Sequence, residues 1–127
     1  MKQVFILVEG QTEEVIVNDG LAPPAQAYGF ALTPTVVITS ATPTGAHRGG
    51  GGWKQYDIRL RSLLGASHAH RVGLLIDYYQ YPQGAPGYGT GGCSAQRQRD
   101  LMHALHTHYP DPRFRPLVVL HEIEALV

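Results

Sequence analysis

The chain has little of what several common protein classes need. Its one cysteine, Cys93, cannot form an internal disulfide or supply the several thiolates of a closed zinc site. No apolar run approaches the roughly 18 residues of a membrane-spanning helix, and residues 1–3 lead into a strand pattern without the apolar core of a signal peptide. The formal net charge is zero, which argues against nucleic-acid binding by bulk charge. We therefore expect a cytoplasmic protein that does not bind membranes.

Strand and helix patterns alternate along the chain. Its 127 residues suffice for one hydrophobic core and are too few for two domains. Apolar and β-branched runs predict strands, and amphipathic runs between them predict helices. The predicted strands cover residues 3–8, 35–39, 71–76 and 116–120, and the predicted helices start at residues 12, 53 and 94. This alternation predicts an α/β fold with a mostly parallel four-stranded sheet flanked by helices.

Glycine and proline mark the predicted loops and helix ends. Residues 41–52 contain five glycines and read as a loop, and residues 78–92 form a second glycine-rich and aromatic loop that we expect to be ordered. In the first helix, we expect Thr12 to be the cap and Pro23 and Pro24 to end or kink it. Gly29 lies just past its expected continuation.

Acidic residues directly follow three of the apolar runs. Glu9 follows residues 4–8, Asp77 follows residues 72–76, and Glu122 and Glu124 come just after residues 117–120. The carboxyl ends of parallel strands meet at one edge of a sheet, so these carboxylates are expected to lie together. Such a cluster repels itself unless a cation lies within it. Glu13 and Glu14 are interpreted as acids of a helix start.

The acidic motifs resemble those of a known fold. In order, VEGxTE from Val8, residues 49–52, DYY from Asp77 and HExEAL from His121 resemble the Toprim (topoisomerase-primase) domain. They are closest in pattern to small bacterial Toprim-like proteins related to overcoming-lysogenization-defect (OLD) nucleases. The resemblance implies a four-stranded parallel sheet, bound Mg²⁺ (or Mn²⁺), and nuclease chemistry, with a bacterial defence or mobile-element setting.

The same resemblance assigns roles to individual residues. It implies that Glu9 and Asp77 are catalytic and hold the metal, Asp77 as the first aspartate of an Asp-x-Asp motif. Tyr79 stands in the second position, and a tyrosine does not replace a carboxylate as a magnesium ligand at neutral pH. We expect Glu122 or Glu124 to supply the missing charge, or else the metal site is weakened.

Basic residues gather in one segment of this neutral chain. Five of them lie within residues 48–71, where Asp57 is the single acid. The glycine run there lacks a Walker pattern, yet it precedes a predicted helix, where backbone N–H groups can approach phosphate. Flexibility is the alternative interpretation of that run. The candidate phosphate or nucleic-acid contacts are Arg48, Gly50, Gly51, Lys54 and His121.

Three functional hypotheses follow. The leading one is divalent-metal-dependent phosphodiester processing by a nuclease-like Toprim domain. The first alternative is a non-catalytic Toprim-like module that binds nucleic acid or a partner protein such as an ATPase. The second is a flavodoxin-like or receiver-like domain with Asp77 as its key acid. Residues 1–127 are interpreted as a single domain, and the unfinished apolar pattern of residues 122–127 leads us to expect a longer natural protein.

Overall fold

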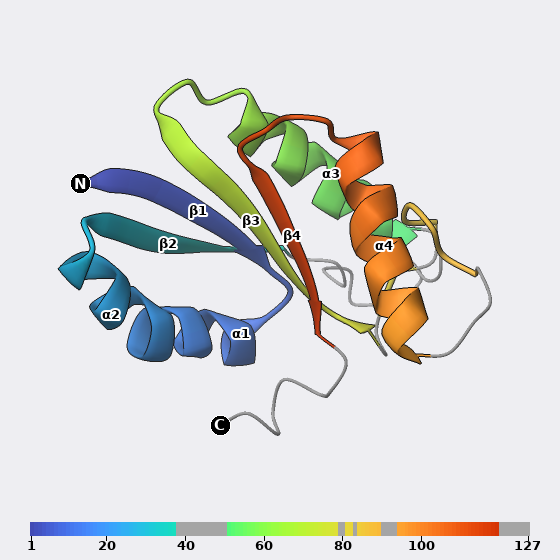
Figure 1. Ribbon diagram of the computed structural model, residues 1–127, viewed down its shortest axis with the longest axis horizontal. Coiled ribbons are helices and arrows are strands. Elements are labelled where there is room, and N and C mark those ends of the chain that lie inside the picture. The colour runs from blue at the N-terminus through green and yellow to red at the C-terminus, as the bar shows by residue number, and fades with distance from the viewer. Residues whose placement is uncertain (38–50, 79–80, 83, 90–93, 120–127) are drawn as a thin grey trace.

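Four parallel strands form the centre of the structure, a computed structural model that describes residues 1–37, 51–78, 81–82, 84–89 and 94–119 (Figure 1). The strand order is β2-β1-β3-β4, and each neighbouring pair is parallel. The strands are β1 (Lys2–Val8), β2 (Phe30–Val36), β3 (Ala69–Asp77) and β4 (Phe114–Val119). The predicted α/β fold with a parallel four-stranded sheet is therefore confirmed.

Helices cover both faces of this sheet (Figure 1). On one face lie α1 (Gln11–Val15), the π-helical segment η1 (Ile16–Leu21) and α2 (Ala22–Ala27), and on the other lie α3 (Gly51–Leu64) and α4 (Ser94–His108). The chain moves from β1 to β2 in one direction and from β2 to β3 and β4 in the other. Because crossovers are right-handed, this reversal places the two groups of helices on opposite faces. None of the described helices has both the length and the apolar character needed to cross a membrane.

Alternating strand residues build a core on each face. Leu7, Leu74 and Ile76 belong to the larger core under α3 and α4, which also contains Trp53, Tyr56, Leu60, Leu101, Leu105 and Phe114. Val8 and Leu75 point the other way and pack with Val17 of η1 in a smaller core. Side chains of β3 point alternately to the two faces of the sheet. Because both faces are covered near the carboxyl end, β3 is buried along most of its length.

The first helical region differs from its prediction. Gly10, and not Thr12, is the N-cap, and no side chain makes a cap hydrogen bond. Pro23 and Pro24 lie in the first turn of α2, where a missing N–H is tolerated, so they do not end the helical path. Gly29 has φ of +85° and follows the last helical residues, as expected for a helix C-terminus.

Two other boundaries were also predicted wrongly. The second strand begins at Phe30 and includes Pro34, which an edge strand tolerates because one of its sides needs no ladder N–H. Residues 38–39 of the predicted strand lie outside the described residues. The predicted loop 41–52 overlaps α3, because Gly51 and Gly52 are helical despite their poor propensity. Tertiary packing of the following Trp53 and Tyr56 stabilises this turn.

The described part of the second predicted loop packs onto the helices. Tyr81 is buried, and its hydroxyl donates a hydrogen bond to the carbonyl of Pro86 at 2.6 Å. Gly87 has φ of +81°, and a Cβ there would lie 3.1 Å from the side chains of Leu101 and Ala104. The loop is thus ordered against α4 at these residues, as the sequence predicted.

Candidate functional site at the carboxyl edge of the sheet

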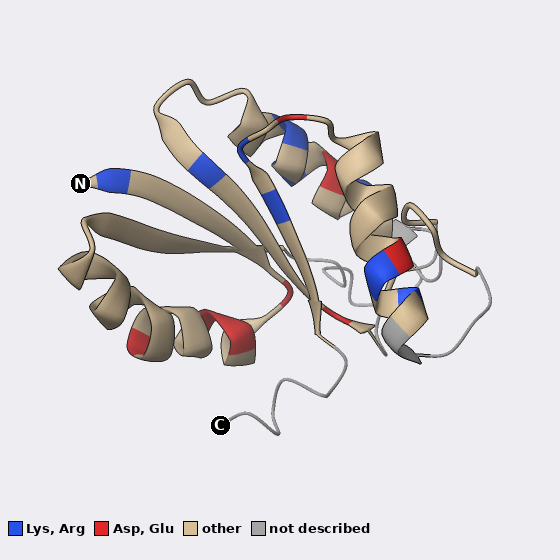
Figure 2. Ribbon diagram, viewed as in Figure 1, with Lys and Arg blue, Asp and Glu red and all other residues tan. Residues whose placement is uncertain are grey.

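Glu9 and Asp77 lie at the same edge of the sheet, called the carboxyl edge here because all four strands end there. Leu7 of β1 pairs with Leu74 of β3. Two residues further in this register, Glu9 falls opposite Ile76 and directly beside Asp77. Asp77, the last residue of β3, is only 6% exposed, and Glu9 is half-buried. Figure 2 shows these acidic positions at the ends of β1 and β3. The prediction that the two acids share one edge is confirmed.

The strand order reverses at β1: the chain adds β2 on one side of it and then β3 and β4 on the other. β1 has β2 on one side and β3 on the other, and the crossovers to these two neighbours lie on opposite faces. In open α/β sheets, the loops diverge at such a switch point and leave a crevice in which ligands bind. Glu9 directly follows β1 and Asp77 ends β3, and these two strands flank this point.

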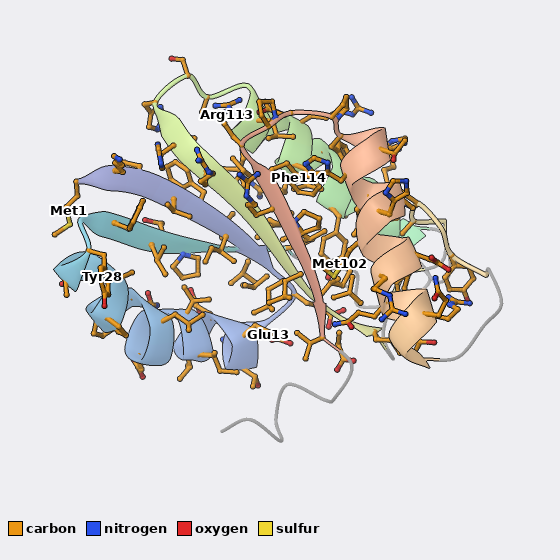
Figure 3. The ribbon with its side chains drawn as sticks, in the orientation of Figure 1. Met1, Glu13, Tyr28, Met102, Arg113 and Phe114 are labelled. Atoms are coloured by element: carbon orange, nitrogen blue, oxygen red, sulfur yellow. The ribbon has the colours of Figure 1, made fainter. Side chains whose placement is uncertain are left out.

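Glu13 is a third acid at this edge, which the sequence favoured as a helix-start residue. It lies in the first turn of α1 and is 8% exposed. A Cβ on Gly10 would lie 3.5 Å from its Oε2 atom, so the carboxylate turns back toward the end of β1. Figure 3 shows Glu13 on α1, near the ends of the strands. The signal was its spacing of four residues from Val17, because both then occupy the buried side of one helix.

Tyr56 brings a buried hydroxyl to these acids. The residue is 1% exposed on α3, and its ring stacks on Trp53 with centroids 5.4 Å apart. Its Oη atom is buried and has no hydrogen-bond partner. Burial, and then the charges of Glu9 and Glu13, raise the pKa of this hydroxyl far above its ordinary value. Tyr56 therefore keeps its proton and presents an unused donor within electrostatic reach of two carboxylates.

Arg97 reaches the edge from α4. Its guanidinium lies over the ring of Tyr78, 5.8 Å from the centroid, and Tyr78 directly follows Asp77. Its Nε atom is buried without a hydrogen-bond partner. Within the described residues, Tyr56 Oη and Arg97 Nε are the buried side-chain polar atoms that lack a partner, and both belong to this edge. Sequence analysis missed Arg97 and Tyr56 because each lies on an ordinary amphipathic helix pattern.

The predicted phosphate contacts are only partly described. Gly51 opens α3, and Lys54 is exposed in its first turn, at the carboxyl edge because α3 runs back against the strand direction. Arg61 is near the other end of α3 and bonds Asp57 at 3.0 Å. The basic segment 48–71 therefore does not line one surface within the described residues. The predicted site residues that lie outside the described residues are Arg48, Gly50, Tyr79, His121, Glu122 and Glu124.

The donors at this edge suit one kind of metal. Glu9, Glu13 and Asp77 offer hard oxygen atoms, which Mg²⁺ prefers, and Mg²⁺ commonly uses one or two carboxylates together with phosphate and water. Across the described ranges, no three His, Cys, Asp or Glu side chains are grouped closely enough to hold an ion by themselves. The residues thus fit a hydrated, substrate-completed magnesium site and do not form a closed protein cage.

The geometry can be set beside known proteins. Residues 8–127 match a family described as a domain of unknown function, DUF4276. The chain belongs to this family. No curated protein and no solved structure gives a significant match. The DUF4276 match includes Glu9, Glu13, Tyr56, Asp77 and Arg97, so every described residue of the carboxyl edge discussed above lies inside the family domain.

Proposed function

We propose that the carboxyl edge binds Mg²⁺ or Mn²⁺ and that the protein processes phosphodiester bonds as a nuclease-like Toprim domain of the cytoplasm. The observation that carries this proposal is the buried, unpartnered hydroxyl of Tyr56, which lies within electrostatic reach of the carboxylates of Glu9 and Glu13. The setting in bacterial defence or a mobile element rests on the Toprim resemblance alone. The expected partner is nucleic acid, and a partner ATPase is the expected protein partner.

Electrostatics supports a cation at this place. Glu13 and Asp77 are both nearly buried, and Glu9 is half-buried directly after β1. Carboxylates withdrawn from water are costly unless positive charge or hydrogen bonds offset the loss of hydration. A divalent cation supplies that charge, and a buried tyrosine hydroxyl can hold one carboxylate in a fixed orientation toward it.

The acids of the carboxyl edge would have different roles in the proposed reaction. The cation, when bound, would polarise a phosphoryl oxygen and neutralise charge that develops on it. Asp77 and Glu13 would hold the cation. Glu9 would be a further ligand or the general acid/base beside the scissile phosphate, because it is the most accessible of the three acids. Glu122 or Glu124 would complete the charge that Tyr79 does not provide.

A non-catalytic binding module is the second candidate function. The absence, within the described residues, of a three-donor metal group favours it. The strand order also matches the first four strands of flavodoxin-like sheets, so fold alone does not separate a Toprim from a flavodoxin-like or receiver-like domain. Metal dependence and cleavage do separate these candidates.

Thermal unfolding with added Mn²⁺ tests the metal site. Ligand present at a hundredfold above its Kd stabilises the folded state by about 2.7 kcal/mol, so we expect Tm to rise by roughly 10 °C in wild type. Asp77→Asn should lose most of this shift, and Asp19→Asn, an exposed acid on η1, should keep it. Equal shifts in both variants would place the cation elsewhere, and no shift in wild type would reject the metal site.

Cleavage of single-stranded DNA, double-stranded DNA and RNA in Mn²⁺ tests the reaction. Glu9→Gln should keep the fold and reduce the rate by a factor on the order of 10² to 10⁴, the usual contribution of a general acid/base. Tyr79→Asp should raise the rate, because it adds the carboxylate that the Toprim pattern has there. A wild-type protein that binds Mn²⁺ and cleaves none of these substrates would favour the binding module.

A further inference from the structure

Arg97 occupies a fixed place at the carboxyl edge. It lies in the first turn of α4, a helix of 15 residues that begins at Ser94. The next residue, Gln98, donates a side-chain hydrogen bond of 2.6 Å to the carbonyl of Val118, which is the penultimate residue of β4. This bond fastens the start of α4 to the ends of the strands, so Arg97 is held close to the site and not on a free surface.

The guanidinium of Arg97 differs from most others in the chain. Its Nε atom is buried without a hydrogen-bond partner, and the guanidinium lies over the ring of Tyr78. Five other arginines donate hydrogen bonds to side chains or carbonyls: Arg61, Arg71, Arg99, Arg113 and Arg115. Arg97 is also half-buried. An arginine that is partly withdrawn from water and lacks an acceptor is costly, typically by about 1–3 kcal/mol for each unmet donor.

An oxyanion would meet these unmet donors. Arginine keeps its charge at any physiological pH, and its planar fork matches two oxygens of a phosphate. The face of Tyr78 holds the guanidinium from one side and leaves the N–H groups at its rim for an acceptor. The amino end of α4 adds favourable potential for an anion at the same place.

The acids nearby decide which oxyanion fits best. Asp77 immediately precedes Tyr78 in the chain, so Arg97 and the acid that is expected to hold a cation both lie at the carboxyl edge. A phosphate has enough oxygens to contact the cation and the guanidinium together, as in other phosphoryl-transfer sites.

We infer that Arg97 binds a phosphate oxyanion of the ligand, an inference that rests on the proposed function of the carboxyl edge. Arg97 thereby becomes the residue that recognises the phosphodiester, while Asp77 and Glu13 hold the cation. Lys54, exposed in the first turn of α3, is a candidate for a further contact in this recognition.

Binding of a fluorescent oligothymidylate of roughly ten nucleotides, followed by anisotropy in the presence of a chelator, tests this role without catalysis. Arg97→Gln should weaken binding by about 10- to 100-fold, the loss expected for hydrogen bonds to charged groups. Arg97→Lys should recover part of the affinity, because it restores the charge without the fork. The matched control is Arg99→Gln, an exposed arginine two residues further along α4 that bonds Gln96.

Competition with inorganic phosphate separates the sources of the oxyanion. Displacement of the oligonucleotide only by an unlabelled oligonucleotide indicates a phosphodiester, and direct binding of inorganic phosphate without oligonucleotide binding indicates a small phosphate compound. In both cases Arg97→Gln must lose the binding. Equal affinity of Arg97→Gln and Arg99→Gln, with both variants folded by circular dichroism, overturns the inference, as does a wild type that binds neither probe. Because the assay contains no metal, its result can be interpreted even if the protein has no metal site.

Discussion

The two ends of the sheet use polar residues in opposite ways. At the amino edge, where the strands begin, the guanidinium of Arg113 donates hydrogen bonds to the carbonyls of Ala66 and Ala69 at 3.0 and 3.2 Å. It also donates to the carbonyl of Leu64, at the end of α3, and to Asp111 at 2.8 Å. At the carboxyl edge, Tyr56 Oη and Arg97 Nε are buried without partners.

This difference separates stability from function. Arg113 donates hydrogen bonds to carbonyls at a helix end and in the following turn, so these groups are satisfied within the folded chain. The carboxyl edge keeps two buried donor atoms without partners beside its acids, which is typical of a site that binds a ligand. Figure 2 shows the same division in charge, with basic positions toward the beginnings of β1, β3 and β4 and acidic positions at the ends of β1 and β3.

The largest expected effect is at the amino edge. Arg113→Met leaves the carbonyls of Leu64, Ala66 and Ala69 and the carboxylate of Asp111 without this donor, so we expect Tm to fall by about 10 °C. The Mn²⁺-induced rise in Tm should remain. Arg59→Met, an exposed arginine of α3, is the control and should change Tm by only about 1–2 °C. A similar fall in both variants would mean that the Arg113 network contributes little.

Acid should weaken this network in a defined range of pH. The side chain of Arg113, and then its backbone N–H, lower the pKa of Asp111 from 3.8 to about 2. A carboxyl whose pKa is lower in the folded state stabilises the protein above its ordinary pKa, and this stabilisation disappears as the pH falls toward the lowered value. Wild type should therefore lose Tm more steeply than Asp111→Asn between about pH 4 and pH 2. Parallel curves for the two proteins would contradict the assigned pKa.

The sequence predicted the sheet better than it predicted the site. Long buried runs such as that of β3 identify strands by themselves, and the alternation with helices then requires parallel pairing. The same logic placed Glu9 and Asp77 at one edge. Element boundaries near proline and glycine were predicted less well. Pro23 is tolerated at a helix start, Pro34 in an edge strand and Gly51 in a packed helix.

The remaining site residues depend on tertiary contacts. Glu13 could have been found from its spacing to Val17, which places it on a buried helix side. Tyr56 and Arg97 carried no such signal, since a tyrosine on an apolar stripe and an arginine near a helix start are ordinary. Their importance comes from a hydroxyl and an Nε atom that the folded chain leaves without acceptors, and hydrogen-bond satisfaction across distant segments cannot be read from local pattern.

The smallest and most diagnostic effect concerns two buried tyrosines. Tyr109 donates a hydrogen bond of 2.5 Å to Asp57 near the amino edge, whereas Tyr56 has no partner at the carboxyl edge. Tyr109→Phe loses a hydrogen bond and should lower Tm by about 3–6 °C. Tyr56→Phe removes an unmet donor and keeps the ring stacked on Trp53, so Tm without metal should stay unchanged or rise by about 1–3 °C.

In Mn²⁺ binding we expect the opposite: Tyr56→Phe should have the larger effect and Tyr109→Phe the smaller. If the hydroxyl of Tyr56 orients Glu9 or Glu13 toward a cation, Tyr56→Phe should weaken Mn²⁺ binding by about 10-fold or more, because lost second partners of metal ligands commonly cost 10- to 100-fold in affinity. Tyr109→Phe should bind Mn²⁺ as wild type does. Trp53 is the single tryptophan of the chain and stacks on Tyr56, so quenching of its fluorescence by Mn²⁺ measures the affinity directly. A Tyr56→Phe protein that loses stability without metal and keeps the wild-type Mn²⁺ affinity would show that this hydroxyl stabilises the fold. The polar groups of the two edges would then have the same structural role.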